Sequence, residues 1–137
     1  MTLVVDVQLQ AAPGDVRHRA AELAATGVGG VFTFEGPHDV FLPLALAAEV
    51  AQLQIMTNVA IALPRSAVQT AHAAWDLQTL SQGRFRLGLG SQIKPHITRR
   101  YGGSWDRPAA QMRDFVGAVK AVFDTWQRGT ALDYRGE

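Results

Sequence analysis

A carboxylate and an imidazole follow one of the apolar runs of this sequence. Glu35 comes directly after the run Gly30–Phe34, and His38 comes three residues later. Both side-chain types can transfer protons near neutral pH when their surroundings adjust their pKa. The pair therefore predicts a proton-handling site. The alternative is an acid and a histidine solvated in a surface loop, with Asp39 capping the helix that follows.

A second polar segment combines basic and aromatic side chains, namely Lys94, His96, Arg99, Arg100, Tyr101 and Trp105. Such a loop either contacts an anionic cofactor tail or substrate, or is solvated and docks on neighbouring structure. The nearby Gly88–Ser91 segment is not a phosphate loop, because it lacks the full G-x-G-x-x-G pattern and the helix that should follow at once. His18 and His72 have no second ligand four residues on, so we expect no metal site.

The elements that must position these residues follow a regular alternation. Four apolar runs predict strands at 3–7, 30–34, 55–63 and 85–89. Helical spacing follows each run, and the start and stop signals are Asp15 and Gly27, Asp39 with Pro43 in the first turn, Ser66 with Gln69 and then Gly83, and Pro108 with Gly129. The sequence therefore predicts an α/β fold of four βα units.

Strands that alternate with helices form parallel sheets through right-handed crossovers. Two architectures fit this order: an open doubly wound sheet, or part of a (β/α)8 barrel. A complete barrel needs roughly 250 residues, so four units in 137 residues make about half of one. Periodicity alone does not choose between the two architectures.

Composition narrows the class of protein. The chain is 47% hydrophobic with a net charge of +1, which gives no electrostatic case for a nucleic acid or an anionic membrane as partner. There is no cysteine, no long apolar stretch and no signal-peptide pattern at the start. We therefore expect a soluble cytoplasmic protein in which residues 1–137 form a single domain.

One segment links the third helix, a turn and the fourth strand. Residues 77–90 (Leu-Gln-Thr-Leu-Ser-Gln-Gly-Arg-Phe-Arg-Leu-Gly-Leu-Gly) resemble the motif D-x-L-S-x-G-R-x-x-L-G-x-G of the luciferase-like monooxygenase superfamily. Gln78 stands where the family has an acidic residue. Residues 30–35 and 55–65 are similar to the family's second and third strands, and residues 90–108 to its F-420-dependent subgroup. The resemblance implies the N-terminal half of a (β/α)8 TIM barrel with four parallel βα units.

The resemblance also implies a reaction and a cofactor. It points to hydride transfer between the deazaflavin coenzyme F-420 and a small organic substrate, or to an FMN-dependent monooxygenase of the same superfamily. The ring site would be lined by Glu35, Asn58, Val59, Gly90 and Ser91. Asn58-Val59 aligns with a non-prolyl cis peptide bond that backs the ring in relatives; the alternative is an ordinary trans strand.

The position of His38 differs from the position of the histidine in the family pattern. Many relatives place a histidine directly after the acid, where this chain has Gly36, so an acid/base role would fall to His38 two residues later. Catalytic roles are therefore predicted for Glu35 and His38.

A function of another class stays open. The family's chain continues into four more βα units, whose last loops grip the cofactor phosphate. The chain could therefore be a catalytically silent half-barrel that self-associates through its open sheet edges. We expect a homo-oligomer, or a fragment of a longer chain.

Overall fold

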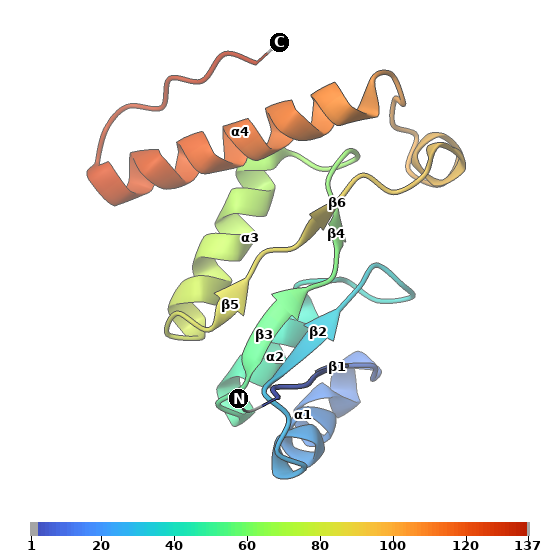
Figure 1. The fold of residues 1–137 in the computed structure, drawn as a ribbon, viewed down its shortest axis with the longest axis vertical. Coiled ribbons are helices and arrows are strands. Elements are labelled where there is room, and N and C mark those ends of the chain that lie inside the picture. The colour runs from blue at the N-terminus through green and yellow to red at the C-terminus, as the bar shows by residue number, and fades with distance from the viewer. Residues whose placement is uncertain (1–2, 137) are drawn as a thin grey trace. The chain divides into compact units, whose positions relative to one another are not determined.

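The computed structural model describes residues 3–136 (Figure 1). Within this range the chain forms two compact units: unit 1 contains residues 3–60 and 76–89, and unit 2 contains residues 61–75 and 90–136. The chain passes between them within β4 (Ala60–Ile61), α3 (Ala67–Leu80) and β6 (Leu89–Gly90). The single-domain organisation of residues 1–137 stays a prediction.

Unit 1 is built on a parallel sheet. Its strands, in spatial order, are β1 (Asp6–Gln8), β2 (Gly30–Thr33), β3 (Gln54–Thr57) and β5 (Phe85–Arg86). The register runs through Val31, which lies opposite Val7 on one side and Ile55 on the other. Val31 and Ile55 are fully buried, whereas Phe32 and Met56, the next pair along the register and on the opposite face, are half-buried. The predicted parallel α/β fold is confirmed.

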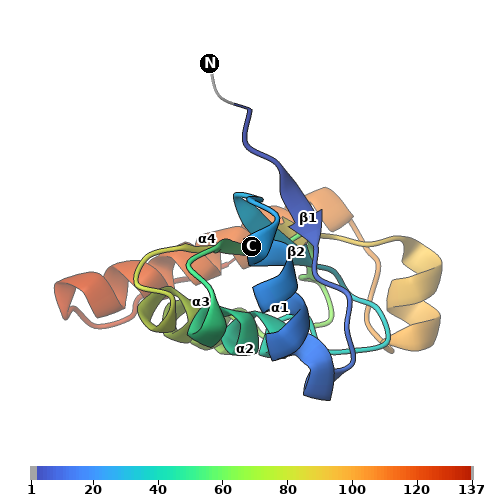
Figure 2. The same cartoon turned by 90° about the horizontal axis from the view of Figure 1, so that it is seen from below.

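Two helices of unit 1 lie on the same face of β1 and β2 (Figure 2). α1 (Val16–Ala25) follows a 3-10 turn at Pro13–Asp15, and α2 (Leu42–Val50) contacts β2 and β3. Helical spacing gives α1 a buried stripe of Val16, Ala20 and Leu23. The two helices pack side by side. Their exposed edges are joined by an ion pair of 2.8 Å between Arg17 and Glu49.

The predicted first strand is wrong in its boundaries. β1 covers Asp6–Gln8, whereas the apolar residues Leu3, Val4 and Val5 are 81%, 67% and 50% exposed. Within unit 1, β1 is an edge strand with β2 as its only neighbour, so these three side chains have no second strand to cover them. The buried residue at this end of the sheet is Leu9.

The predicted third and fourth strands are each divided in two. The third run forms β3 and β4, separated at Asn58-Val59, and the fourth forms β5 and β6, separated at Leu87-Gly88. The later halves pair with each other as a two-stranded sheet. Its backbone hydrogen bonds include Ala60 N to Gly88 O at 2.9 Å. The third and fourth runs therefore both pass from the main sheet into the same two-stranded sheet.

Unit 2 is organised by α4 (Pro108–Arg128). Pro108 lies in its first turn and Gly129 ends it in the left-handed region (φ 66°), as predicted. Its buried face carries Phe115, Val119 and Val122. Further along the helix, Trp126 meets Trp75 edge-on at 5.3 Å between ring centroids. Both tryptophans are half-buried.

The segment before α4 was predicted only as a long loop. It contains one π-helical turn, His96–Arg100, closed by a hydrogen bond of 3.2 Å from Tyr101 N to His96 O. Ile97, the second residue of this turn, is fully buried. Within residues 3–136, no helix is both long and apolar enough to cross a membrane.

Candidate functional site

The carboxyl ends of β1, β2 and β3 meet at one edge of the unit 1 sheet. Thr33 lies opposite Thr57, and Asn58 N donates a hydrogen bond of 2.7 Å to Thr33 O. Residues that follow these strands therefore gather at this edge, which is where the active sites of βα barrels assemble. The arrangement places Glu35, His38 and Asn58 at one edge of this sheet; that they form one site stays a prediction.

A pocket opens at the ends of β1 and β2. Its polar lining comprises Gln8, Gln10, Thr33, His38 and Asp39, and its apolar lining includes Leu9, Phe34 and Pro43. His38 is exposed and faces this pocket, whereas Glu35 is not among the residues that line it. The structure thus groups His38 with two glutamines that were not predicted as site residues. Their signal in the sequence was a pair of glutamines, separated by Leu9, that follows the first apolar run.

Asp39 has a structural role in the same loop. Its Oδ1 accepts hydrogen bonds from the backbone N–H groups of Phe41 (2.8 Å) and Leu42 (2.7 Å), at the start of α2. At the carboxyl end of β2, the Thr33 hydroxyl donates a hydrogen bond of 2.6 Å to Val40 O. These bonds fix both ends of the loop that carries Glu35 and His38. Asp39 therefore bonds the start of α2 as predicted, but from two residues before the N-cap position, which is Phe41.

The peptide bond Asn58-Val59 is cis, as the resemblance implied. Asn58 is exposed, whereas its neighbour Thr57 is 2% exposed. The Thr57 hydroxyl donates to Gly88 O at 2.8 Å and accepts from Gly88 N at 2.9 Å. A Cβ atom on Gly88 would overlap Thr57 O, so this close approach requires glycine. The sequence analysis missed Thr57; a hydroxyl at the end of a buried strand was its signal.

The other two predicted lining residues belong to unit 2. Gly90 lies in β6 and accepts a hydrogen bond of 2.8 Å from Ala62 N. The Ser91 hydroxyl donates to Gln92 O at 3.1 Å. That Gly90 and Ser91 line one ring site together with Glu35, Asn58 and Val59 stays a prediction.

The chemistry of the unit 1 edge fits a flavin-type ring in one respect. Such a ring has an apolar face and a polar rim, and the edge exposes both an aromatic side chain, Phe34 (45% exposed), and a side-chain amide, Asn58. The pocket lining includes no lysine or arginine that could hold a phosphate. Within residues 3–136, no group of three His, Asp or Glu side chains could hold a metal ion.

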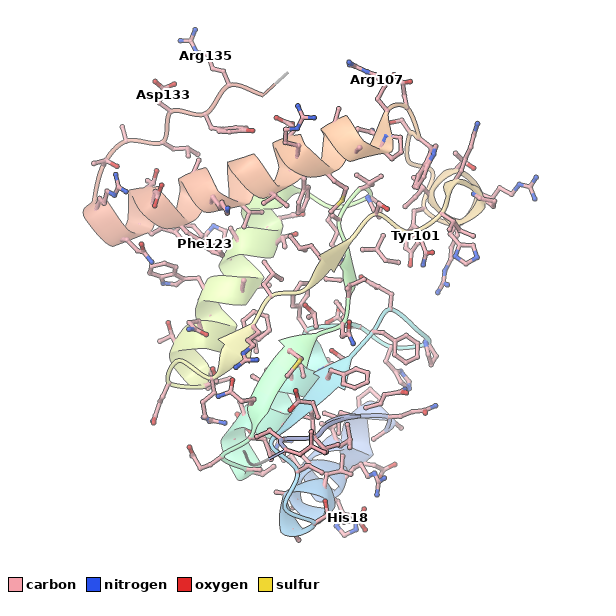
Figure 3. The ribbon with its side chains drawn as sticks, viewed as in Figure 1. His18, Tyr101, Arg107, Phe123, Asp133 and Arg135 are labelled. Atoms are coloured by element: carbon pink, nitrogen blue, oxygen red, sulfur yellow. The ribbon has the colours of Figure 1, made fainter. Side chains whose placement is uncertain are left out.

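The basic segment of unit 2 surrounds the π-helical turn. Figure 3 shows Tyr101 beside this turn and Arg107 at the start of α4. The Arg100 guanidinium lies 5.4 Å from the centroid of the Tyr101 ring, in cation–π range. Arg107 has a left-handed backbone (φ 45°), which is uncommon outside glycine.

Comparison with known sequences gives the family. The family described as Luciferase-like monooxygenase matches residues 3–137. An uncharacterized protein of Mycobacterium tuberculosis is 48% identical over 119 residues, which are 86% of this chain and 35% of that protein. A second protein of the same organism, provisionally named a coenzyme F-420-dependent oxidoreductase, is 31% identical over 122 residues, or 85% of this chain and 34% of that protein. The chain thus spans about a third of the length of these relatives.

Solved structures give the same fold at low sequence identity. A monooxygenase of Streptomyces bottropensis matches with a TM-score of 0.80 and 19% identity, over 98% of this chain and 46% of that one. The oxygenating constituent of 3,6-diketocamphane monooxygenase of Pseudomonas putida, in complex with FMN, matches with 0.75 and 14%, over 89% and 40%. The F-420-dependent tetrahydromethanopterin reductase of Methanopyrus kandleri matches with 0.71 and 18%, over 96% and 42%.

These matches select the barrel over the open doubly wound sheet: the four parallel βα units correspond to part of a (β/α)8 TIM barrel. The match of the family model to residues 3–137 shows that the chain belongs to the luciferase-like monooxygenase family.

Proposed function

We propose that this chain forms part of the ring-binding site of an oxidoreductase that transfers a hydride between coenzyme F-420 and a small organic molecule. The observation that carries the proposal is the convergence of the β2 and β3 ends in unit 1, where Asn58 N bonds to Thr33 O at 2.7 Å. The 31% identical relative with the provisional F-420 name supports this choice of cofactor.

Each lining residue would have a role that follows from its chemistry. When bound, the cofactor ring supplies the hydride chemistry, and the protein supplies position and electrostatics. The exposed amide of Asn58 would bind the polar rim of the ring, and the backbone at Val59 would support its face. Glu35 would border the ring from the β2 loop, and Gly90 and Ser91 would complete the lining. His38, in the pocket with Gln8 and Gln10, would hold or release a proton on the substrate side.

An FMN-dependent monooxygenase is the second candidate of the enzyme class. It is favoured by the structural match to an FMN complex that is itself part of a monooxygenase. The two enzymes differ in whether oxygen is consumed. The substrate in either case would be a small molecule, acted on in the cytoplasm and without a nucleic acid or membrane partner.

A homo-oligomer without catalytic activity is the candidate of another class. Its support is the edge strand β1 and the exposed side chains of Leu3, Val4 and Val5, which directly precede it. Exposed apolar residues on an unpaired edge favour association with another strand. Light scattering tests this reading, which a stable monomer would contradict.

Titration of the purified chain with F-420 and with FMN, followed by ring fluorescence, tests the enzyme proposal. We expect saturable binding of F-420, weakened about tenfold or more by Asn58→Ala, the loss of one good polar contact. The matched control is Gln52→Ala, an exposed amide at the opposite end of β3. No binding of either cofactor, or equal effects of the two substitutions, would contradict the proposed site. Tighter binding of FMN would favour the second candidate.

A further inference from the structure

We propose that Gln8 and Gln10 determine the substrate class of the unit 1 edge, and that they select an uncharged molecule with a carbonyl or hydroxyl oxygen. The pocket at the ends of β1 and β2 would accordingly bind one end of a ketone, an aldehyde or an alcohol, and would reject a carboxylate or a phosphate. That this ligand is the substrate rests on the proposed function. The chemical class of the ligand follows from the pocket itself.

The pairing of β1 with β2 holds the two glutamines at the pocket. Gln8 lies opposite Phe32 in the parallel register, and Leu9 N donates a hydrogen bond of 2.8 Å to Phe32 O, so the pairing continues past the end of β1. Leu9 is 5% exposed and therefore anchors the backbone between Gln8 and Gln10, which both line the pocket. Thr33, on the neighbouring strand, is 4% exposed. An ordered wall of this kind reduces the entropy that ligand binding costs.

The two side-chain amides leave a hydrogen-bond donor for a ligand. Gln8 Nε2 donates a hydrogen bond of 3.4 Å to Gln10 Oε1, which orients the Gln10 amide through its oxygen. Gln10 Nε2 donates no hydrogen bond within residues 3–136, so its two N–H groups are available. An amide N–H group binds the oxygen of a carbonyl or a hydroxyl. A small number of such polar groups fixes the orientation of a ligand in a pocket that is otherwise apolar.

The charges around the pocket disfavour an ionic ligand. Among the described residues that line it, none is Lys or Arg, His38 is the one titratable base and Asp39 has the one carboxylate. A ligand carboxylate or phosphate would lose part of its hydration there without gaining a permanent cation as partner, and Asp39 would repel it. A ligand ammonium would find Asp39 Oδ1 already bonded to two backbone N–H groups. An uncharged ligand avoids both costs.

The size of the pocket limits what it can hold. Its volume is about 50 Å³, whereas a dry cavity that binds benzene has a volume of about 150 Å³. The pocket therefore takes one polar group of a substrate rather than the whole molecule. Phe34 also lines the pocket, is 45% exposed and follows Thr33, whose carbonyl accepts the hydrogen bond from Asn58 N. The apolar body of the substrate would thus lie on Phe34, at the edge of the sheet that also carries Asn58.

Nuclear magnetic resonance of the full chain tests the proposal at about pH 8, where an unperturbed imidazole is uncharged. The probes are cyclohexanone, cyclohexanecarboxylate and cyclohexylammonium, which share one apolar body and differ in charge. We expect cyclohexanone to shift the side-chain amide signals of Gln8 and Gln10 saturably, and to bind at least about fivefold more tightly than either ion. Gln10→Leu should weaken binding of the ketone at least about fivefold, because it removes a hydrogen-bond donor at nearly constant size.

The matched control is Gln52→Leu, which should leave binding of the ketone within about twofold of the unsubstituted chain. Gln52 and Gln10 are both exposed, so folding is retained and is checked by circular dichroism, and Gln52 does not line the pocket.

Each titration is made without a cofactor and again with F-420 present, which separates this inference from the proposed function. Tighter binding of either ion, equal losses in the two variants, or F-420 binding without binding of the ketone would overturn the inference alone. Binding of the ketone by a chain that binds neither F-420 nor FMN would overturn the proposed function, and with it the assignment of the ligand as a substrate.

Discussion

Thr57 and Gly88 exchange two hydrogen bonds across the point where β3 and β5 leave the main sheet. The Thr57 hydroxyl donates to Gly88 O at 2.8 Å and accepts from Gly88 N at 2.9 Å. Ala60 N also donates to Gly88 O, at 2.9 Å, whereas Thr57 Oγ1 is the only acceptor for Gly88 N among residues 3–136. The hydroxyl thus satisfies a backbone group beside the exposed Asn58.

Thr57→Val should therefore lower the free energy of unfolding by about 2 kcal/mol, because a half-buried N–H loses its acceptor while the side-chain shape is kept. Urea unfolding followed by far-ultraviolet circular dichroism measures the change. Thr70→Val is the control: Thr70 is equally buried, but the carbonyl that its hydroxyl bonds, Ser66 O, also accepts from Thr70 N at 3.0 Å. Equal losses of unfolding free energy in the two variants would show that the hydrogen bonds between Thr57 and Gly88 add no stability of their own.

Gly88→Ala tests the close approach itself. Because the added methyl group would overlap Thr57 O, the two segments must separate, and overpacking of this kind costs about 1–3 kcal/mol. Gly14→Ala provides the comparison, since no atom lies within 4 Å of the methyl group there and the change should be within about 0.5 kcal/mol. Thermal unfolding of both variants measures the difference. An unchanged midpoint of thermal unfolding for Gly88→Ala would contradict the close approach of Gly88 to Thr57 O.

Arg84 joins the end of α2 to the start of β5. Its guanidinium donates to Leu53 O at 2.6 Å, Ala51 O at 3.1 Å and Ala48 O at 3.5 Å. Arg84→Lys keeps the charge but loses the planar fork that reaches several carbonyls at once, and we expect a loss of about 2 kcal/mol. Arg86→Lys, on an exposed side chain of the same strand, should cost under about 0.5 kcal/mol. Urea midpoints that fall equally would contradict this role.

Local signals in the sequence predicted the ends of elements well. Pro108 and Gly129 bound α4, and Gly27 and Gly83 have the left-handed backbone expected after a helix. Each of these signals depends on the conformational range of one residue, which the sequence states directly. The order of the main strands and helices could be predicted from the spacing of apolar residues along the chain.

Features that depend on pairing between distant segments could not be predicted. The apolar run at residues 3–7 looked like a strand, but burial was decided by the neighbours of β1, and its first residues are exposed. The division of the third and fourth runs depends on the contact between Thr57 and Gly88, 31 residues apart. In the candidate site, Glu35 and His38 could be found from their place after a strand, whereas the grouping of Gln8 and Gln10 with His38 in one pocket depended on the pairing of β1 with β2.

Asp39 and Asp15 give the last prediction, because both precede a helix of unit 1 and only the Asp39 carboxylate bonds backbone N–H groups at the helix start. Asp39 Oδ1 accepts from two backbone N–H groups at the start of α2, whereas Asp15, at the start of α1, makes no capping hydrogen bond through its side chain. Asp39→Ala should lower the free energy of unfolding by about 1 kcal/mol, and Asp15→Ala by less than half of that. Asp39→Asn should retain most of the stability, since the amide oxygen can accept the same bonds. Urea unfolding of the three variants measures the series.

Because Asp39 also fixes the loop that carries His38, Asp39→Ala should in addition raise amide hydrogen exchange in residues 36–42. A loss for Asp15→Ala as large as that for Asp39→Ala would mean that charge near the helix start, rather than the two hydrogen bonds, stabilises this part of the sheet edge.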